Sequence, residues 1–170
     1  EQCEAARPHK LRVTVTLNAP YYTAEQVTEV MELCRELVDV GVCGVIVADV
    51  GLVHALATAR LALGITISSV AAANSTSACE LFRDLGASRI VLPRHLTLPE
   101  INRIRDNVRD VQLEVFILND GCVFEEGLCS TTHALGAFCL APWQYGFERV
   151  DGEPLTEPER ERLARNAEDY

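Results

Sequence analysis

The segment NDGCVFEEGLCSTTHALGAFC, at positions 119–139, gathers side chains that can hold a metal ion or a cluster. This cysteine segment contains three of the chain's seven cysteines, Cys122, Cys129 and Cys139, and one of its four histidines, His133. Soft thiolates bind zinc or iron–sulfur centres, and both centres normally take four protein ligands. His133 could supply the fourth ligand here, or a cysteine from outside this chain could do so.

Two other interpretations of the cysteines remain open from the residues alone. Buried free cysteines would act as small apolar side chains, which we expect of Cys34 and Cys79 because both fall on apolar helical stripes. Disulfides are the second alternative, although an odd number of cysteines in a chain of 170 residues is untypical of a secreted disulfide framework. We therefore expect a reducing compartment and a cytoplasmic protein. The spacing matches neither the CxxC zinc patterns nor the CxxCxxC ferredoxin run.

The elements that must position these side chains alternate between short apolar runs and helical stripes. Strands are predicted at 12–18, 45–49, 65–69, 89–94 and 113–118. Helices between them are predicted from an apolar pattern over 52–63 and from capping boxes at Thr23–Gln26, Ser77–Glu80 and Thr97–Glu100. Five strand–helix units in a row, with strands apolar on both faces, predict an α/β protein with a parallel sheet, either a barrel or a doubly wound sheet.

Polar residues end almost every predicted strand. They are Asn18, Asp49, Ser69, Arg94 and Asn119. In a TIM-type barrel these positions surround one mouth, where substrates bind. Turn formation alone would also favour polar residues there, but five in register favour a shared substrate-binding site. The cysteine segment follows the fifth strand, so we expect it at the same mouth of a partial barrel.

Charge and composition narrow the class of partner. The chain has 25 acidic and 15 basic residues, so its net charge is −10 and direct nucleic-acid binding is not expected. A small-molecule or peptide substrate is expected instead, or RNA only through a partner. No apolar run is long enough to cross a bilayer, so no membrane partner is expected. We place one domain at 1–142, followed by a charged segment at 143–170 that is predicted to form a short helix.

The order of these motifs resembles the collagenase-like peptidase family, peptidase family U32. The resemblance lies in VTVTLN at 13–18, GVCGVIVADVG at 41–51, LGASRIVLPRHLTLPEI at 85–101 and LEVFILNDGCVFEEGLCS at 113–130. It implies a TIM-type barrel of which this chain supplies the third to seventh strands, so we expect a fragment or a shortened member. Because an open barrel leaves strand edges uncovered, we expect a second copy or a partner protein to cover them.

The resemblance also implies a cofactor. Similar family members carry a 4Fe-4S cluster on four cysteines, and Cys122, Cys129 and Cys139 match the first three. The fourth lies beyond Tyr170 in the family pattern, and the spacing from Cys129 to Cys139 is shorter than in that pattern. A 4Fe-4S cluster is therefore the cofactor that the resemblance implies, and zinc is the alternative.

Three hypotheses about function follow. Relatives carry out oxygen-independent hydroxylation of the ubiquinone ring or of an RNA base with prephenate as oxygen donor, and Arg94 would bind such an anion through bidentate contacts. The family name implies a peptidase, although no activated nucleophile can be identified in the sequence. The third hypothesis is a non-catalytic partner subunit or scaffold, suggested by the missing barrel strands.

Overall fold

The computed structural model describes residues 2–118, 126–127, 152–158 and 160. Its sheet consists of β1 (Thr14–Leu17), β2 (Gly44–Val47), β3 (Gly64–Ile67), β4 (Arg89–Val91) and β5 (Gln112–Glu114). The connecting helices are α2 (Ala24–Asp39), α3 (Val50–Ala59), α4 (Thr76–Asp84) and α5 (Leu98–Asn107). Shorter elements are α1 (Gln2–Ala6) and the 3-10 turns η1 (Arg7–His9) and η2 (Ser69–Ala71).

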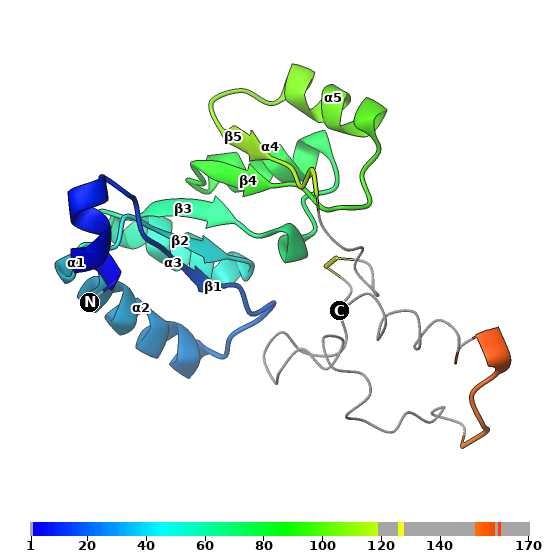
Figure 1. The fold of residues 1–170 in the computed structure, drawn as a ribbon, viewed down its shortest axis with the longest axis horizontal. Coiled ribbons are helices and arrows are strands. Elements are labelled where there is room, and N and C mark those ends of the chain that lie inside the picture. The colour runs from blue at the N-terminus through cyan, green and yellow to red at the C-terminus, as the bar shows by residue number, and fades with distance from the viewer. Residues whose placement is uncertain (1, 119–125, 128–151, 159, 161–170) are drawn as a thin grey trace.

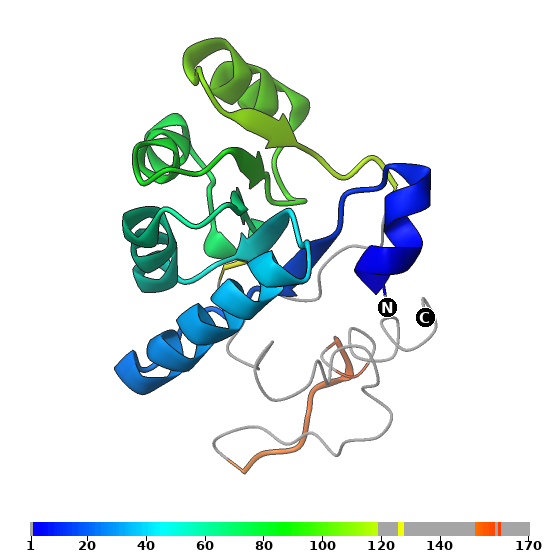
Figure 2. The ribbon, with the colours of Figure 1, turned by 90° about the vertical axis from the view of Figure 1, so that its left-hand side faces the viewer.

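All five strands are parallel and lie in chain order, β1-β2-β3-β4-β5 (Figure 1). Because crossovers between parallel strands are right-handed, strands added always on the same side place every connecting helix on one face. Figure 2 shows α2 to α5 side by side on that face, with α1 on the other side of the sheet. The prediction of five consecutive strand–helix units is confirmed. In the described part of the chain the sheet is open and does not close into a barrel.

The core lies between the sheet and this single layer of helices. Strand residues on the helix side, such as Val45, Val47, Ile67 and Ile90, are fully buried. Cys34 of α2 and Cys79 of α4 join this cluster as buried free thiols, as their positions on apolar stripes predicted. The main hydrophobic cluster therefore packs the helices against one face of the sheet.

The helix starts follow their capping residues, with one correction. Thr23 and Thr97 form the predicted capping boxes of α2 and α5. The predicted box at Ser77–Glu80 is wrong, because α4 begins two residues earlier with Ser75 as its N-cap, whose side chain accepts from the Ala78 N–H. The helix predicted at 52–63 covers 50–59 instead, since Arg60 takes the left-handed conformation that ends it.

Strand β5 is shorter than the predicted run 113–118. The last ladder bond beside it joins the Leu92 N–H to the Glu114 carbonyl at 2.8 Å, and the next donor in that register, the Arg94 N–H, bonds Oε2 of Glu126 instead. Beyond this point the backbone leaves the sheet, and Ile117 and Leu118 are 95% and 94% exposed. The apolar run predicted as strand therefore lies mostly at the surface.

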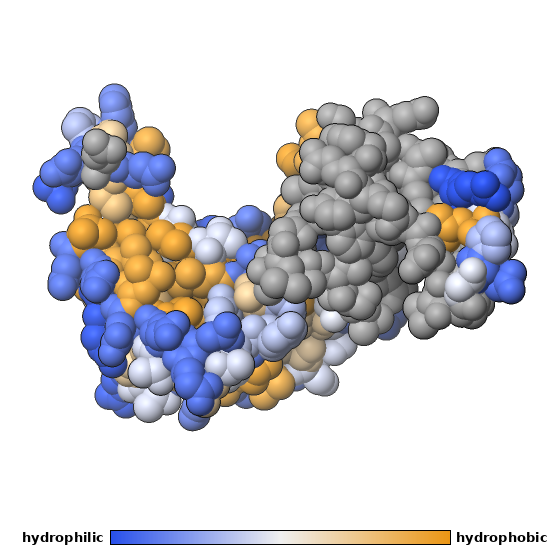
Figure 3. Space-filling view, turned by 90° about the horizontal axis from the view of Figure 1, so that it is seen from below, coloured by the Kyte–Doolittle hydropathy of each residue, from blue (hydrophilic) through white to orange (hydrophobic). Residues whose placement is uncertain are grey.

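A second exposed apolar area lies along the free edge of β1. Figure 3 shows it from below as a hydrophobic patch between α1 and α2. The hollow there has a volume of about 510 Å³, and its apolar lining consists of Val13, Val15, Leu37, Val40 and Val42. Both edges of the sheet thus expose apolar side chains that another strand or helix could cover.

The C-terminal segment is described only in part. Residues 157, 158 and 160 are helical, and the Arg160 N–H donates to the Thr156 carbonyl at 3.0 Å. Most of the helix predicted within 143–170, and the proposed domain boundary at 142, lie outside the described residues. No helix in the described part of the chain is long and apolar enough to cross a membrane.

Strand β3 comes close to β2 at Gly44, and a substitution there can test this contact. A Cβ at Gly44 would lie 2.8 Å from the Gly64 carbonyl oxygen, whereas a Cβ at Gly64 would meet its nearest atom, Ser88 Oγ, at 3.5 Å. We expect Gly44→Ala to lower the free energy of unfolding by about 1–3 kcal/mol because backbone must shift. Urea denaturation should show less than about 1 kcal/mol for Gly64→Ala. Equal losses in the two variants would contradict this geometry.

The thiol of Cys79 makes stability depend on pH. Burial, with a smaller contribution from Glu80, raises its pKa from 9.0 to about 11. The folded chain therefore keeps a proton that the unfolded chain loses, so this stabilisation is complete below about pH 9 and falls as pH rises toward 11. We expect Cys79→Ala to flatten the fall by about 2 kcal/mol in urea titrations between these pH values. Val53→Ala, which shortens a buried side chain that does not titrate, should keep the wild-type slope.

Candidate functional site

The carboxyl ends of β3 and β4 carry side chains that meet a single buried carboxylate. Ser69 begins η2 directly after β3, and its Oγ–H donates to Oε1 of Glu126 at 2.6 Å. Arg94 follows β4, and its backbone N–H donates to Oε2 of Glu126 at 2.5 Å. The Arg94 guanidinium also pairs with Oε1 through Nη1. We call Ser69, Arg94 and Glu126 the strand-end site.

Burial makes these three contacts necessary. Glu126 is 3% exposed, and an ionised carboxylate out of water costs several kcal/mol unless donors and a positive charge surround it. A hydroxyl, a backbone N–H and a guanidinium supply those donors. Among the described residues no buried side-chain nitrogen or oxygen lacks a hydrogen-bond partner. The site is therefore a completed polar cluster rather than a chance contact.

Arg94 is held on two sides and remains partly open. Its Cζ lies 3.9 Å from the centroid of the Phe116 ring, in cation–π geometry. Its side chain is 29% exposed, and Nη1 is the guanidinium nitrogen that bonds within the described part of the chain. Nε and Nη2 keep donors that an incoming carboxylate could use.

Asn18 and Asp49 lie at the same carboxyl-end edge but have other partners. Asn18 Nδ2 donates to Ser68 Oγ at 3.4 Å, beside the strand-end site. Asp49 is the N-cap of α3, where Oδ1 accepts from the Leu52 N–H at 2.7 Å, and Oδ2 accepts from the Tyr22 N–H at 3.3 Å. Asp49 thus joins the turns after β1 and β2.

Tyr22 brings a titratable group to this edge. Its phenol has a raised pKa, chiefly because burial disfavours the phenolate, with a smaller contribution from the negative charge of Asp49. The phenol therefore stays a neutral donor at physiological pH. Asp49 and Tyr22 help to fix the shape of this edge, and Arg94 brings a positive charge to it beside Glu126.

The predicted metal ligands Cys122, Cys129, His133 and Cys139, and the predicted binding residue Asn119, lie outside the described residues. Within the described part of the chain there is no group of three or more His, Cys, Asp or Glu side chains that could hold a metal ion. The thiols described are Cys3, Cys34, Cys43 and Cys79, and all four are free. The ligand set therefore stays a prediction from the sequence.

Glu126 is the residue that the sequence analysis missed. It lies in the middle of the cysteine segment, within the letters CVFEEGLC, and its charge there suggested only a polar loop. A carboxylate followed by Gly127 between two candidate thiolate ligands was the available signal. Its partner Ser69 lies 57 positions earlier, so no local pattern could connect them.

A hollow of about 670 Å³ lies at the opposite end of the sheet. Thr14, Gly44, Thr66 and Arg89 are among the residues that line it, at the amino-terminal halves of the strands. In open α/β sheets and in barrels, ligands bind at the carboxyl ends of the strands. We therefore take the strand-end site, and not this hollow, as the candidate functional site.

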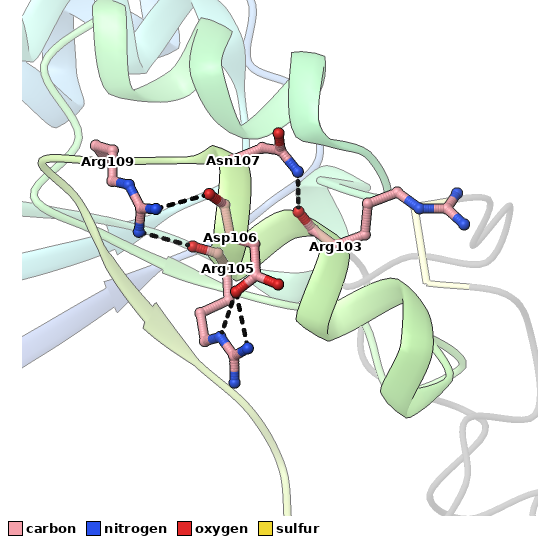
Figure 4. A network of polar contacts seen from close by, with 5 residues as sticks. All are labelled: Arg103, Arg105, Asp106, Asn107 and Arg109. Carbon is pink, nitrogen blue, oxygen red and sulfur yellow. Dashed lines mark hydrogen bonds and ion pairs between the residues drawn. The ribbon is translucent and has the colours of Figure 1, made fainter.

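The arginines of α5 are largely engaged in local contacts. Figure 4 shows Arg105 paired with Asp106, and Arg109 donating to the backbone carbonyls of Arg105 and Asp106 at the end of the helix. The guanidinium of Arg103 points away from these contacts. Positive side chains at a helix C-terminus satisfy its last carbonyls, so this cluster stabilises the end of α5.

Comparison with known proteins places this arrangement in a family. Residues 1–162 match the family model described as Peptidase family U32. The chain belongs to peptidase family U32. The solved structure of the U32 peptidase Mk0906 is similar with a TM-score of 0.59 and 26% identity, over 66% of this chain and 48% of that one. The resemblance found in the sequence is thus confirmed.

Two curated relatives in family U32 are named for an activity on RNA. The tRNA hydroxylation protein P of Escherichia coli (strain K12) is 28% identical over 115 residues, which are 68% of this chain and 25% of that protein. The tRNA hydroxylation protein P1 of Bacillus subtilis (strain 168) is 24% identical over 160 residues, 89% of this chain and 37% of that protein. The chain thus spans about a quarter to a third of the length of these relatives.

Removing Arg94 tests the strand-end site. Arg94→Ala would leave the buried carboxylate of Glu126 without its positive partner, so we expect a loss of about 2–4 kcal/mol in the free energy of unfolding. Arg105→Ala is the matched control, because its ion pair with Asp106 is exposed and worth about 0.5 kcal/mol or less. Urea denaturation monitored by circular dichroism measures both. Similar small losses would mean that Glu126 does not depend on Arg94.

Proposed function

We propose that this U32 protein takes part in the hydroxylation of an RNA base at the carboxyl-end edge of its sheet. The observation that carries the proposal is the strand-end site, where Arg94 and Ser69 meet a residue of the cysteine segment. The names of the two tRNA hydroxylation relatives support the class of reaction. A positively charged group that contacts a residue of the cysteine segment would suit a redox reaction with an anionic co-substrate.

The cofactor of this proposal is a 4Fe-4S cluster on Cys122, Cys129 and Cys139. His133 is the candidate for a fourth ligand within the chain, and zinc is the alternative metal. The donor set fits, because thiolates suit both centres, and Glu126 fixes the middle of the segment beside the strand-end site. When bound, the cluster would exchange electrons with the substrate at this edge.

The protein's own residues would bind and orient the co-substrate. The Nε and Nη2 donors of Arg94 would hold a carboxylate of the anionic oxygen donor, and Phe116 would keep the guanidinium in place. Asn18, Ser69 and Asn119 are the other proposed binding residues, through hydrogen bonds. Asp49 completes the predicted set, with a role in shaping the turn after β2, since both its oxygens accept backbone N–H groups.

The net charge of the chain and the uncovered edges of its sheet indicate which partners to expect. With a net charge of −10, the chain is a weak match for an RNA backbone, so we propose that RNA is presented by a second protein. The apolar edges at β1 and after β5 are the surfaces that a second copy or a second barrel protein would cover. A cytoplasmic location is part of the same proposal, since it keeps thiolates reduced.

Metal and sulfide analysis after anaerobic purification tests the cofactor. We expect iron and acid-labile sulfide in near-equal amounts, with visible absorbance from thiolate-to-iron charge transfer. Cys122→Ser and Cys129→Ser should lose both, because each removes a ligand. Cys43→Ser is the matched control, since Cys43 lines the hollow at the far end of the sheet. Zinc without sulfide would overturn the redox proposal.

Mass spectrometry of tRNA nucleosides tests the reaction. The protein, expressed in cells that lack tRNA hydroxylation protein P, should restore a nucleoside heavier by one oxygen atom, and Cys122→Ser should not. The peptidase hypothesis predicts a different result, which is cleavage of gelatin that survives Cys122→Ser and requires added zinc. A protein with neither activity, but a stable complex with a second barrel protein, would support the scaffold hypothesis.

A further inference from the structure

Glu126 stands out because its surroundings come from two strand ends while its own chain neighbours are candidate metal ligands. It lies four residues after Cys122 and three before Cys129. Its side chain is 1% exposed, and donors from Ser69 and Arg94 bond both of its oxygens. Burying a charged side chain costs free energy, and hydrogen-bond donors of the folded protein must replace its contacts with water.

Gly127 gives a second and independent observation of the same docking. Its φ of +92° is favourable only for glycine, and a Cβ there would lie 2.3 Å from the Cβ of Ala72 and 3.2 Å from its Cα. The backbone at Gly127 therefore lies directly against the residue that ends η2. Charge at one residue and close packing at the next attach the cysteine segment to the same place.

The length of the chain limits the distance between Glu126 and the two nearest cysteines in the sequence. A fully extended chain spans at most about 3.6 Å per residue, so the Cα of Cys122 is within about 14 Å of that of Glu126, and the Cα of Cys129 within about 11 Å. These bounds hold for any path of the chain. Holding Glu126 at the strand ends therefore sets an upper limit on how far the chain can carry either cysteine from the strand-end site.

We propose that Glu126 is a positioning residue that fastens the cysteine segment to the ends of β3 and β4 and sets the direction of the Arg94 guanidinium. One carboxylate thereby couples the candidate cluster ligands to the candidate anion-binding arginine. The catalytic consequence rests on the proposed function, but the fastening does not. The acidic side chain is required, because the amide of glutamine would turn a donor toward the donors of Arg94.

Thiol labelling of the metal-free protein tests the fastening directly. Limited maleimide treatment followed by peptide mass spectrometry gives a separate rate for each cysteine. We expect Glu126→Ala to raise the labelling rates of Cys122 and Cys129 by about tenfold, because local opening becomes easier. Glu126→Gln should lie between Glu126→Ala and the wild type. Glu32→Ala, at an exposed carboxylate of α2, is the matched control and should leave the rates unchanged.

The buried thiols of Cys34 and Cys79 report whether the fold survives. If both stay protected in Glu126→Ala while Cys122 and Cys129 become reactive, the proposal is supported. If the whole variant unfolds, Ser69→Ala, which removes one donor, should produce the same selective increase. Unchanged rates in the folded variants, or wild-type rates for Cys122 and Cys129 equal to those of the unfolded chain, would overturn the proposal.

Metal content separates this proposal from the proposed function. If Glu126→Ala raises the labelling rates selectively in a protein that binds no iron, the positioning role of Glu126 is supported and the proposed cluster is contradicted. If Glu126→Ala instead keeps its iron and sulfide, its visible absorbance and its labelling rates, the proposed cluster is supported. The positioning role of Glu126 is then contradicted. In the coupled case, Glu126→Ala should lower the iron content of the anaerobically purified protein and weaken its binding of a small carboxylate such as malonate.

Discussion

Parallel pairing in chain order is the constraint from which the rest of this structure follows. When each new strand is added on the same side, every right-handed crossover brings its helix to the same face. Five carboxyl ends then lie along one edge, and the turns that leave them present their side chains together. The opposite face of the sheet receives no helix from these connections (Figure 2).

The open sheet explains why stability and function are divided between its two faces. The helix-covered face carries the buried aliphatic side chains and the two core thiols, which supply the hydrophobic free energy of folding. The carboxyl-end edge carries the carboxylates of Asp49 and Glu126, which hold turns and a distant segment through hydrogen bonds. Hydrophobic packing and polar contacts thus lie in different parts of the sheet.

The uncovered edges agree with the place of this chain in family U32. The aligned segments make up 25% and 37% of the two tRNA hydroxylation relatives, and the match covers 48% of the similar solved chain. Apolar side chains along β1 and after β5 are exposed surfaces that another strand or helix could cover. A partner chain could cover the same surfaces.

Local signals in the sequence predicted the architecture because they act over a few residues. Apolar runs located all five strands, and the capping residues Thr23 and Thr97 located two helix starts. The errors have local causes as well. Ser77–Glu80 has the letters of a capping box, but Ser75 satisfies the same helix start first. Beyond β5 the next ladder donor, the Arg94 N–H, bonds the distant Glu126 instead, a contact that no pattern within 113–118 records.

The sequence by itself determined the order of the strands and helices, and the residues Asn18, Asp49, Ser69 and Arg94 at one edge, since parallel strands must end together. Only the tertiary structure decided how those residues are used. Asp49 became a helix cap that also accepts from Tyr22, and Arg94 became the partner of Glu126. Such contacts join residues far apart in the chain. The partners of a buried carboxylate are the donors that surround it in the folded protein, and its neighbours in sequence do not reveal them.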